Sequence, residues 1–152
     1  MFADVVRRGV SSMDLGPEPL HVPISRSVWP KMPVILSVDD DCRLLFLYWQ
    51  SFGQAGYRCV PCETPKAALE ALTILPVALV TLDFDMPGQN GAQLAREIRT
   101  LRPKIPIVLI TGAESLQDED LSCFDCVHRK GSPPAQLFAK IRGLLGAASP
   151  CA

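Results

Sequence analysis

Short apolar runs alternate with amphipathic stretches over most of the chain, and this alternation predicts a repeated strand–helix unit. Runs of four to six mainly apolar residues, typical of buried strands, occupy 34–38, 57–60, 77–82, 107–110 and 126–129, of which the second and fifth are the least apolar. Helical spacing of apolar residues lies between these runs. We therefore expect helices over 42–55, after Thr64, after the loop 86–91, within 113–122 and after Ser132.

Capping residues and helix breakers predict several helix ends. Thr64 before Pro65, and Ser132 before Pro133, each combine an N-cap residue with proline at the first helical position. Gly56 is expected to end the first helix. The core-facing positions predicted for the four longer helices are Leu44, Leu45, Leu47, Tyr48 and Phe52; Ala68, Leu69, Leu72 and Leu75; Leu94, Ile98 and Leu101; and Leu137, Ile141, Leu144 and Leu145.

Five strand–helix units in succession predict an α/β fold. Strands that are apolar throughout are buried on both faces, which requires helices on both sides of a parallel sheet. Right-handed crossovers then restrict the arrangement to a doubly wound five-stranded sheet. The expected domain covers 33–146, preceded by a flexible N-terminal arm over 1–32 with four prolines and followed by a frayed tail over 147–152. We expect no output domain after the fifth helix.

Composition excludes several classes of protein. A formal net charge of −1 argues against non-specific nucleic-acid binding. No apolar run approaches the roughly 18 residues that span a membrane, and the first eight residues do not read as a secretory signal. We therefore expect a cytoplasmic protein whose six cysteines are reduced thiols. Zinc shared by the CxxC pairs 59–62 and 123–126 is not expected, because strands 2 and 5 would form opposite sheet edges, about 19 Å apart.

The residues that follow the strands carry the chemistry. Asp39, Asp40 and Asp41 follow the first strand, Asp83 the third, Thr111 the fourth and Lys130 the fifth. In a sheet of order 2-1-3-4-5 these four strands are neighbours, and sites of such sheets lie beyond their carboxyl ends. Each pair of like charges about 5 Å apart costs roughly 3 kcal/mol at an effective dielectric constant near 20, so a lysine or a hard cation is needed. Carboxylate oxygens suit Mg²⁺, and attack of a carboxylate on a phosphoryl donor is the expected reaction.

Taken together, these stretches resemble a response regulator receiver domain of the CheY-like type. The resemblance rests on Val34–Asp41, on the DxxMPGxxG stretch Asp83–Gly91, on Ile105–Gly112 and on Lys130, and it covers about residues 33–146. It implies the flavodoxin-like strand order 2-1-3-4-5. It also implies two-component or phosphorelay signalling, with a sensor histidine kinase or a histidine phosphotransfer protein as donor and a downstream protein as target.

The resemblance also implies a role for each site residue. Asp83 is the implied phosphoacceptor. Asp40 binds Mg²⁺ directly and Asp39 through water, while Asp83 adds a carboxylate oxygen and Asp85 its backbone carbonyl. Thr111 hydrogen-bonds the phosphoryl group, and Lys130 pairs first with Asp83 and then with a phosphoryl oxygen. Asp85 also occupies a position that tunes hydrolysis in the family.

Three features depart from the family pattern. Gly131 stands where receivers usually carry a proline, and Val127 where many carry a switch tyrosine or phenylalanine. The stretch from Thr111 to Lys130 is short, so we expect a clipped or irregular fourth helix. These departures leave open a degenerate receiver that docks partners without phosphorylation. A haloacid-dehalogenase-like phosphatase, suggested by the DxD at Asp83 and Asp85, is disfavoured because that motif belongs on the first strand of a longer domain.

Overall fold

The computed structural model describes residues 32–147 of the chain. The strands are β1 (Val34–Val38), β2 (Arg58–Cys62), β3 (Val77–Asp83), β4 (Ile107–Thr111) and β5 (Cys126–Arg129). The helices are α2 (Cys42–Gln54), α3 (Pro65–Ile74), α4 (Gly91–Leu101), α5 (Asp118–Leu121) and α6 (Pro134–Ala147). The predicted arm over 1–32 and tail over 147–152 lie outside the described residues, apart from Met32 and Ala147.

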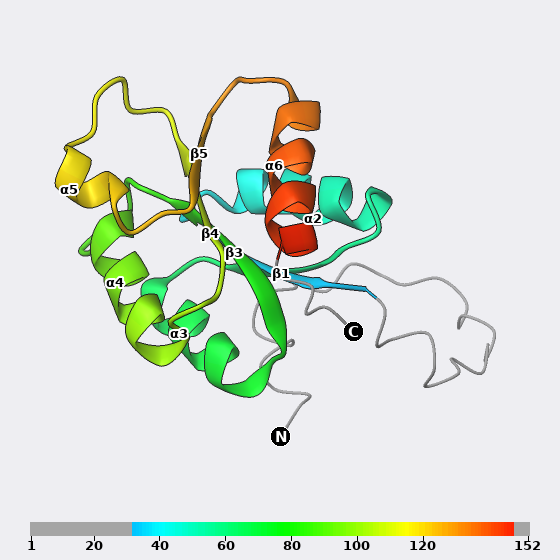
Figure 1. Cartoon of the computed structure of the whole chain (residues 1–152), viewed down its shortest axis with the longest axis horizontal. Coiled ribbons are helices and arrows are strands. Elements are labelled where there is room, and N and C mark those ends of the chain that lie inside the picture. The colour runs from blue at the N-terminus through cyan, green and yellow to red at the C-terminus, as the bar shows by residue number, and fades with distance from the viewer. Residues whose placement is uncertain (1–31, 148–152) are drawn as a thin grey trace.

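The five strands form one parallel sheet in the order β2-β1-β3-β4-β5, which confirms the predicted fold. Helices α2 and α6 cover one face, and α3, α4 and α5 cover the other (Figure 1). Two apolar layers fill the spaces between sheet and helices. Leu36, Leu82 and Ile107 belong to the layer under α3 and α4, whereas Ile35 and Leu79 belong to the layer under α2 and α6.

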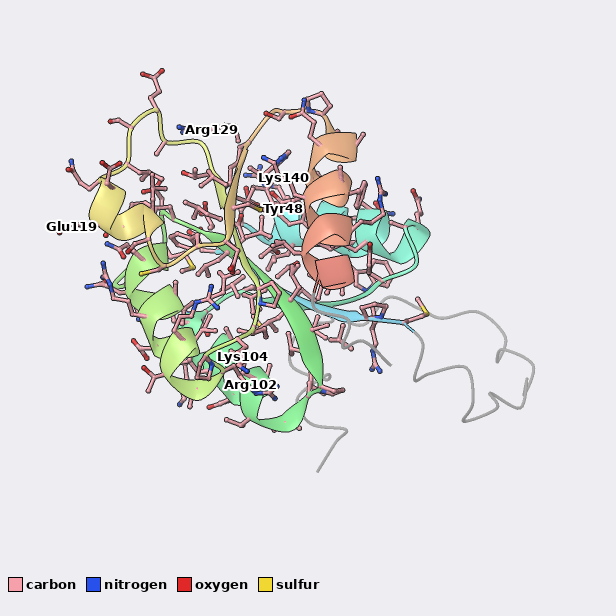
Figure 2. The ribbon with its side chains drawn as sticks, in the orientation of Figure 1. Tyr48, Arg102, Lys104, Glu119, Arg129 and Lys140 are labelled. Carbon is pink, nitrogen blue, oxygen red and sulfur yellow. The ribbon has the colours of Figure 1, made fainter. Side chains whose placement is uncertain are left out.

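Hydrogen bonds from side chains fix several helix ends. Thr64 caps α3 through the amide of Ala67, as predicted. Asn90 and Gln93 form a reciprocal capping box at the start of α4. At the other end of α4, Arg102 donates hydrogen bonds to backbone carbonyls at the end of α3 and so ties the two helices together (Figure 2).

Two helices differ in detail from the prediction. Helix α6 begins at Pro134, one residue later than a Ser132 cap followed by Pro133 requires. The expected clipped fourth helix is confirmed: α5 is a single turn of four residues, Asp118–Leu121.

Of the five core positions predicted in α2, Leu47 was wrong. Leu45 and Phe52 are buried, but Phe46, Leu47 and Trp49 are 55%, 53% and 52% exposed. The apolar run is nearly continuous, so it wraps around the helix, and only one side of α2 contacts the sheet. In α4, Leu101 is likewise exposed rather than on the buried side.

The described cysteines lie in the core or toward the surface of the domain. All five described cysteines are free. Strands β2 and β5 are the two edges of the sheet. Moreover, Cys59 and Cys62 contribute to opposite apolar layers, as do Cys126 and Cys123. Neither CxxC pair therefore presents two thiols on one side of the sheet, which agrees with the prediction against shared zinc.

His128 of β5 is buried and is 4% exposed. Its Nδ1 atom has no hydrogen-bond partner within the described residues. Burial, together with the charge of Lys140, lowers the pKa of the imidazole.

Candidate functional site

Three carboxylates and one ammonium group meet at the carboxyl edge of the sheet. Asp39 directly follows β1 and Asp83 is the last residue of β3; they are 2% and 4% exposed. One carboxylate oxygen from each of Asp39, Asp40 and Asp83 lies within 4.8 Å of the others. Lys130, directly after β5, places its Nζ 2.9 Å from Asp83 Oδ1 and 3.3 Å from Asp39 Oδ2. The structure thus brings together four of the predicted site residues.

The triplet of acids after β1 divides between two tasks. Asp41 is the N-cap of α2: its side chain accepts a hydrogen bond of 2.9 Å from the amide of Arg43 and pairs with the Arg43 guanidinium. Asp39 turns inward, and its Oδ1 accepts a hydrogen bond from the amide of Asp41. Asp40 is exposed and contributes its oxygen from the solvent side. Asp41 therefore caps α2, while the two residues before it contribute to the carboxylate cluster.

Burial and neighbouring charges shift the pKa values of Asp83 and Lys130. Burial raises the pKa of the Asp83 carboxyl, the hydrogen bond from Lys130 opposes this rise, and the charge of Asp39 adds to it. Burial also disfavours the Lys130 ammonium, but its hydrogen bonds and charge interactions with Asp83 and Asp39 outweigh burial, so the pKa of Lys130 is raised. Lys130 is therefore the cation that holds two buried carboxylates together.

The donor set fits a hard divalent cation. All three groups offer carboxylate oxygens, and their mutual separations leave room for one ion. Mg²⁺ binds through one or two carboxylates and keeps several water molecules. Two of the carboxylates are buried and one is exposed, which provides such an ion with both fixed ligands and an open side toward solvent.

Thr111 and Asp85 lie beside this group rather than in it. Thr111 is the last residue of β4 and is fully buried. Its Oγ1 accepts a hydrogen bond of 3.0 Å from the amide of Ala113. Asp85 is exposed in the loop after β3, and its carboxylate is not one of the clustered three. Thr111 ends β4 rather than following it, and Asp85 follows β3, so both lie at the carboxyl edge of the sheet.

The backbone after β5 positions Lys130. The amide of Lys130 donates a hydrogen bond of 2.8 Å to the carbonyl of Thr111, which ties the end of β5 to the end of β4. Gly131 follows with φ +89°, a conformation that favours glycine, and the described residues contain no cis peptide bond. The turn after the lysine is therefore built on glycine in place of the usual proline.

Two contributors to the site were missed by the sequence analysis. Gly91 opens α4 against the backbone of Asp83 and has no room for a side chain. Its place in the DxxMPGxxG stretch could have signalled this contact. Tyr48 of α2 faces the α6 side (Figure 2), and burial together with the nearby charge of Asp39 raises its pKa to about 12. No sequence signal links Tyr48 to the site.

Comparisons with known proteins agree with this geometry. The sequence profile described as response regulator receiver domain matches residues 35–128. The chain belongs to the response regulator receiver domain family. Among curated relatives, the transcriptional regulatory protein AruR of Pseudomonas aeruginosa is 38% identical over 122 residues, which cover 75% of this chain and 50% of AruR. The chain spans about half, or less, of the length of the curated relatives it matches.

Solved receiver structures resemble this receiver domain throughout its sheet. The response regulator TrrA of Thermotoga maritima in complex with Mg²⁺ and BeF is 29% identical with a TM-score of 0.70, and the match covers 74% of this chain and 99% of that one. A second structure holds TrrA with the histidine kinase ThkA, at 30% identity and a TM-score of 0.70, with 75% and 99% coverage. No described helix of this receiver domain has the length and apolarity needed to cross a membrane.

Proposed function

We propose that this receiver domain accepts a phosphoryl group on Asp83 and transmits the signal by altering a protein–protein surface. The observation that carries the proposal is the placement of Lys130 between Asp83 and Asp39, with three carboxylate oxygens within 4.8 Å. A carboxylate can act as the nucleophile in such a transfer, and the neighbouring ammonium group can stabilise charge on the transferred group.

The step transfers one phosphoryl group. A carboxylate oxygen of Asp83 attacks the phosphorus of a phosphohistidine or a small acyl phosphate, a new O–P bond forms, and the bond from phosphorus to the donor breaks. Asp39, Asp40, Asp83 and the carbonyl of Asp85 would hold Mg²⁺, which would supply positive charge to the phosphoryl oxygens. Lys130 then donates its hydrogen bond to a phosphoryl oxygen in place of the Asp83 carboxylate. The hydroxyl group of Thr111 donates a hydrogen bond to a second phosphoryl oxygen.

The proposed donors are a sensor histidine kinase or a histidine phosphotransfer protein, and the proposed target is a downstream protein. The complex of ThkA with the related TrrA supports the first of these, and the Mg²⁺–BeF complex of TrrA supports the metal. The chain acts as a phosphoryl acceptor rather than as an enzyme with turnover on a separate substrate. We place it in the cytoplasm, in keeping with its free thiols.

The experiment that tests the proposal is intact mass spectrometry after incubation with acetyl phosphate and Mg²⁺. The wild-type chain is expected to gain one phosphoryl group, whereas Asp83→Asn and the wild type with EDTA gain none. Asp118→Asn, in the exposed turn of α5, is the matched control and is expected to gain the group as the wild type does. A folded, Mg²⁺-treated wild type that gains no phosphoryl group would overturn the proposal.

The alternative is a receiver that docks partners without phosphorylation. It is favoured by Val127 at the switch position, by Gly131 and by the single-turn α5, because these change the elements that carry the phosphorylation signal in the family. A partner that binds the wild type and Asp83→Asn with equal affinity, with and without acetyl phosphate, would support this alternative.

A further inference from the structure

Helix α2 carries two exposed aromatic side chains on one side. The rings of Phe46 and Trp49 stack with centroids 6.0 Å apart and an interplanar angle of 25°. Cys42 and Gly53 continue the same stripe at helical spacing, and both are exposed. A Cβ atom on Gly53 would have nothing within 4 Å. We call Phe46, Trp49 and the open position at Gly53 the aromatic flank.

The aromatic flank points away from α6 and toward the outer edge of the sheet. Tyr48 stacks on Phe52, and Phe52 meets Phe138 of α6 edge-on, so these residues occupy the α6 side of α2. Trp49 is turned about 100° from Tyr48 around the helix axis. Helix α2 packs mainly against β2, which is the outer strand. The aromatic flank therefore lies above the open edge of β2.

The edge of β2 does not favour the addition of another strand along its whole length. Pro61 lies within β2 and has no amide hydrogen to donate. An occupant of this side of the molecule must therefore be held mainly by side-chain contacts with the aromatic flank. Two stacked aromatic rings supply a large apolar area for such contacts.

The chain enters the sheet beside the aromatic flank. The amide of Arg58 donates a hydrogen bond to the carbonyl of Pro33, and the amide of Tyr57 donates one to Phe52 near the end of α2. Pro33 therefore lies near the C-terminal end of α2, and 31 residues of sequence precede Met32. From Phe46 to Gln54 the helix rises about 12 Å, which about four extended residues span.

The sequence of this preceding segment carries apolar residues at alternate positions. Leu20, Val22, Ile24 and Val28 share one parity, which is interrupted by the charged Arg26. The other parity holds His21, Pro23, Ser25, Ser27 and Trp29. An extended chain presents alternate side chains to one side. Pro23 and Pro30 favour extended backbone at the residues before them.

We propose that residues 20–30 of this same chain pack on the aromatic flank, with Ile24 and Val28 against Phe46 and Trp49. This assigns an intramolecular contact to part of the stretch predicted as an arm from the sequence. The contact removes apolar surface of both partners from water, and it requires no new strand pairing. It is independent of the phosphoryl chemistry proposed above.

Tryptophan fluorescence of the full chain tests this proposal. Trp29 and Trp49 are the only two tryptophans, so Trp29→Phe leaves Trp49 as the sole reporter. In this background, Ile24→Glu with Val28→Glu is expected to shift Trp49 emission to longer wavelength and to increase its quenching by acrylamide. The matched control, Ser25→Glu with Ser27→Glu, adds the same charges at the alternate positions and is expected to change neither value. Far-UV circular dichroism verifies that each variant is folded.

Two results would overturn the proposal. The first is that Trp49 has the same emission wavelength and the same acrylamide quenching in the two double variants. This would mean that Ile24 and Val28 contribute no more to the protection of Trp49 than Ser25 and Ser27 do. The second is protection of Trp49 that increases with protein concentration, together with a dimer on size-exclusion chromatography that Ile24→Glu with Val28→Glu leaves intact. That second result would assign the aromatic flank to a second copy of the chain.

Discussion

Gly91 lies so close to Asp83 that a Cβ atom on Gly91 would overlap the Asp83 carbonyl oxygen. The amide of Gly91 also donates a hydrogen bond of 2.7 Å to the carbonyl of Phe84. The first residue of α4 therefore holds the end of β3 from which the Asp83 side chain emerges. Only a residue without a side chain permits this contact.

Gly91→Ala is expected to lower the free energy of unfolding by about 1–3 kcal/mol, because the methyl group forces the backbone of Asp83 to move. The same displacement is expected to slow phosphorylation by acetyl phosphate. Urea unfolding and intact mass measure the two effects. Gly143→Ala in α6, where nothing lies within 4 Å of an added Cβ, is the control and is expected to stabilise by about 0.5–1 kcal/mol. Equal stability changes in the two variants would contradict the role of Gly91.

Asp83 is expected to reduce stability at neutral pH in the absence of metal. Because its pKa is raised in the folded state, the folded chain binds a proton there more readily than the unfolded chain. The free energy of unfolding therefore falls as pH rises from the ordinary carboxyl value of 3.8 through the raised one. Asp83→Asn should be more stable than the wild type near pH 7 in EDTA, and the difference should narrow as the pH is lowered. A wild type more stable than Asp83→Asn under these conditions would refute this sign.

Magnesium is expected to stabilise the wild type more than it stabilises Asp83→Asn. A ligand that binds only the folded state adds about 2.7 kcal/mol when its concentration is one hundred times its dissociation constant. Removal of one of three carboxylates weakens the site and so reduces this gain. Thermal unfolding in increasing MgCl₂, with NaCl at matched ionic strength as the control, measures it. The same gain in both chains would place the bound ion away from Asp83.

Arg99 is expected to be the main anchor of the chain around the short α5. Its guanidinium pairs with Asp125 at 2.6 Å and donates hydrogen bonds to backbone carbonyls that include those of Ile105 and Cys123. Arg99→Ala should lower the free energy of unfolding by about 2 kcal/mol, since these are hydrogen bonds from a charged group. Amide hydrogen exchange should rise first around Asp125.

Arg96 provides a matched control for this anchor. It lies one turn earlier on α4 and pairs with Asp120 at 3.3 Å, but its side chain is 52% exposed. Arg96→Ala should therefore change stability by less than about 1 kcal/mol. If the two alanine variants lose the same stability, the partly buried contacts of Arg99 contribute nothing beyond an ordinary surface ion pair.

His128 is expected to make the fold sensitive to mild acid. Its pKa is lowered in the folded state by burial and by Lys140, so stability is lost as pH falls below the ordinary histidine value of 6.5. His128→Leu removes this loss and the buried Nδ1 atom without a partner, and it should stabilise by about 1–2 kcal/mol near neutral pH. Urea unfolding of both chains at pH 7.5 and pH 5 should show a larger difference at the lower pH. A difference that is independent of pH would refute the titration argument.

The sheet and most of the site could be predicted because both follow from chain order. Parallel strands end at the same edge, so in a sheet of order 2-1-3-4-5 the residues at the ends of β1, β3 and β5 meet there. This is why Asp39, Asp83 and Lys130 could be placed from their positions once the strand order was expected from the family resemblance. The hydroxyl of Thr111, by contrast, is engaged with the amide of Ala113, a contact that depends on the local turn and leaves no mark in the sequence.

The exposed side of α2 could not be predicted because the apolar run at 44–49 is continuous. Such a run carries no helical period, so it does not tell which residues face the sheet. The orientation of α2 depends instead on Phe52 and Tyr48 packing toward α6, which is a tertiary relation. The contacts of Arg99 could not be predicted either. Its partners include backbone carbonyls of distant residues, and such partners depend on the tertiary structure.

Lys130 reaches Asp39 across 91 residues of sequence, and this separation bears on how the protein is made. A ribosome that adds roughly 5–20 residues per second completes Asp83 several seconds before it reaches Lys130. During that interval both carboxylates exist without their ammonium partner, and the sheet lacks its last strand. The addition of β5 and Lys130 thus completes the sheet and balances the charge of Asp39 and Asp83, and α6 follows to close the apolar layer that contains Leu137 and Ile141. A chain released before this point has every carboxylate of the site and no folded environment in which to use them.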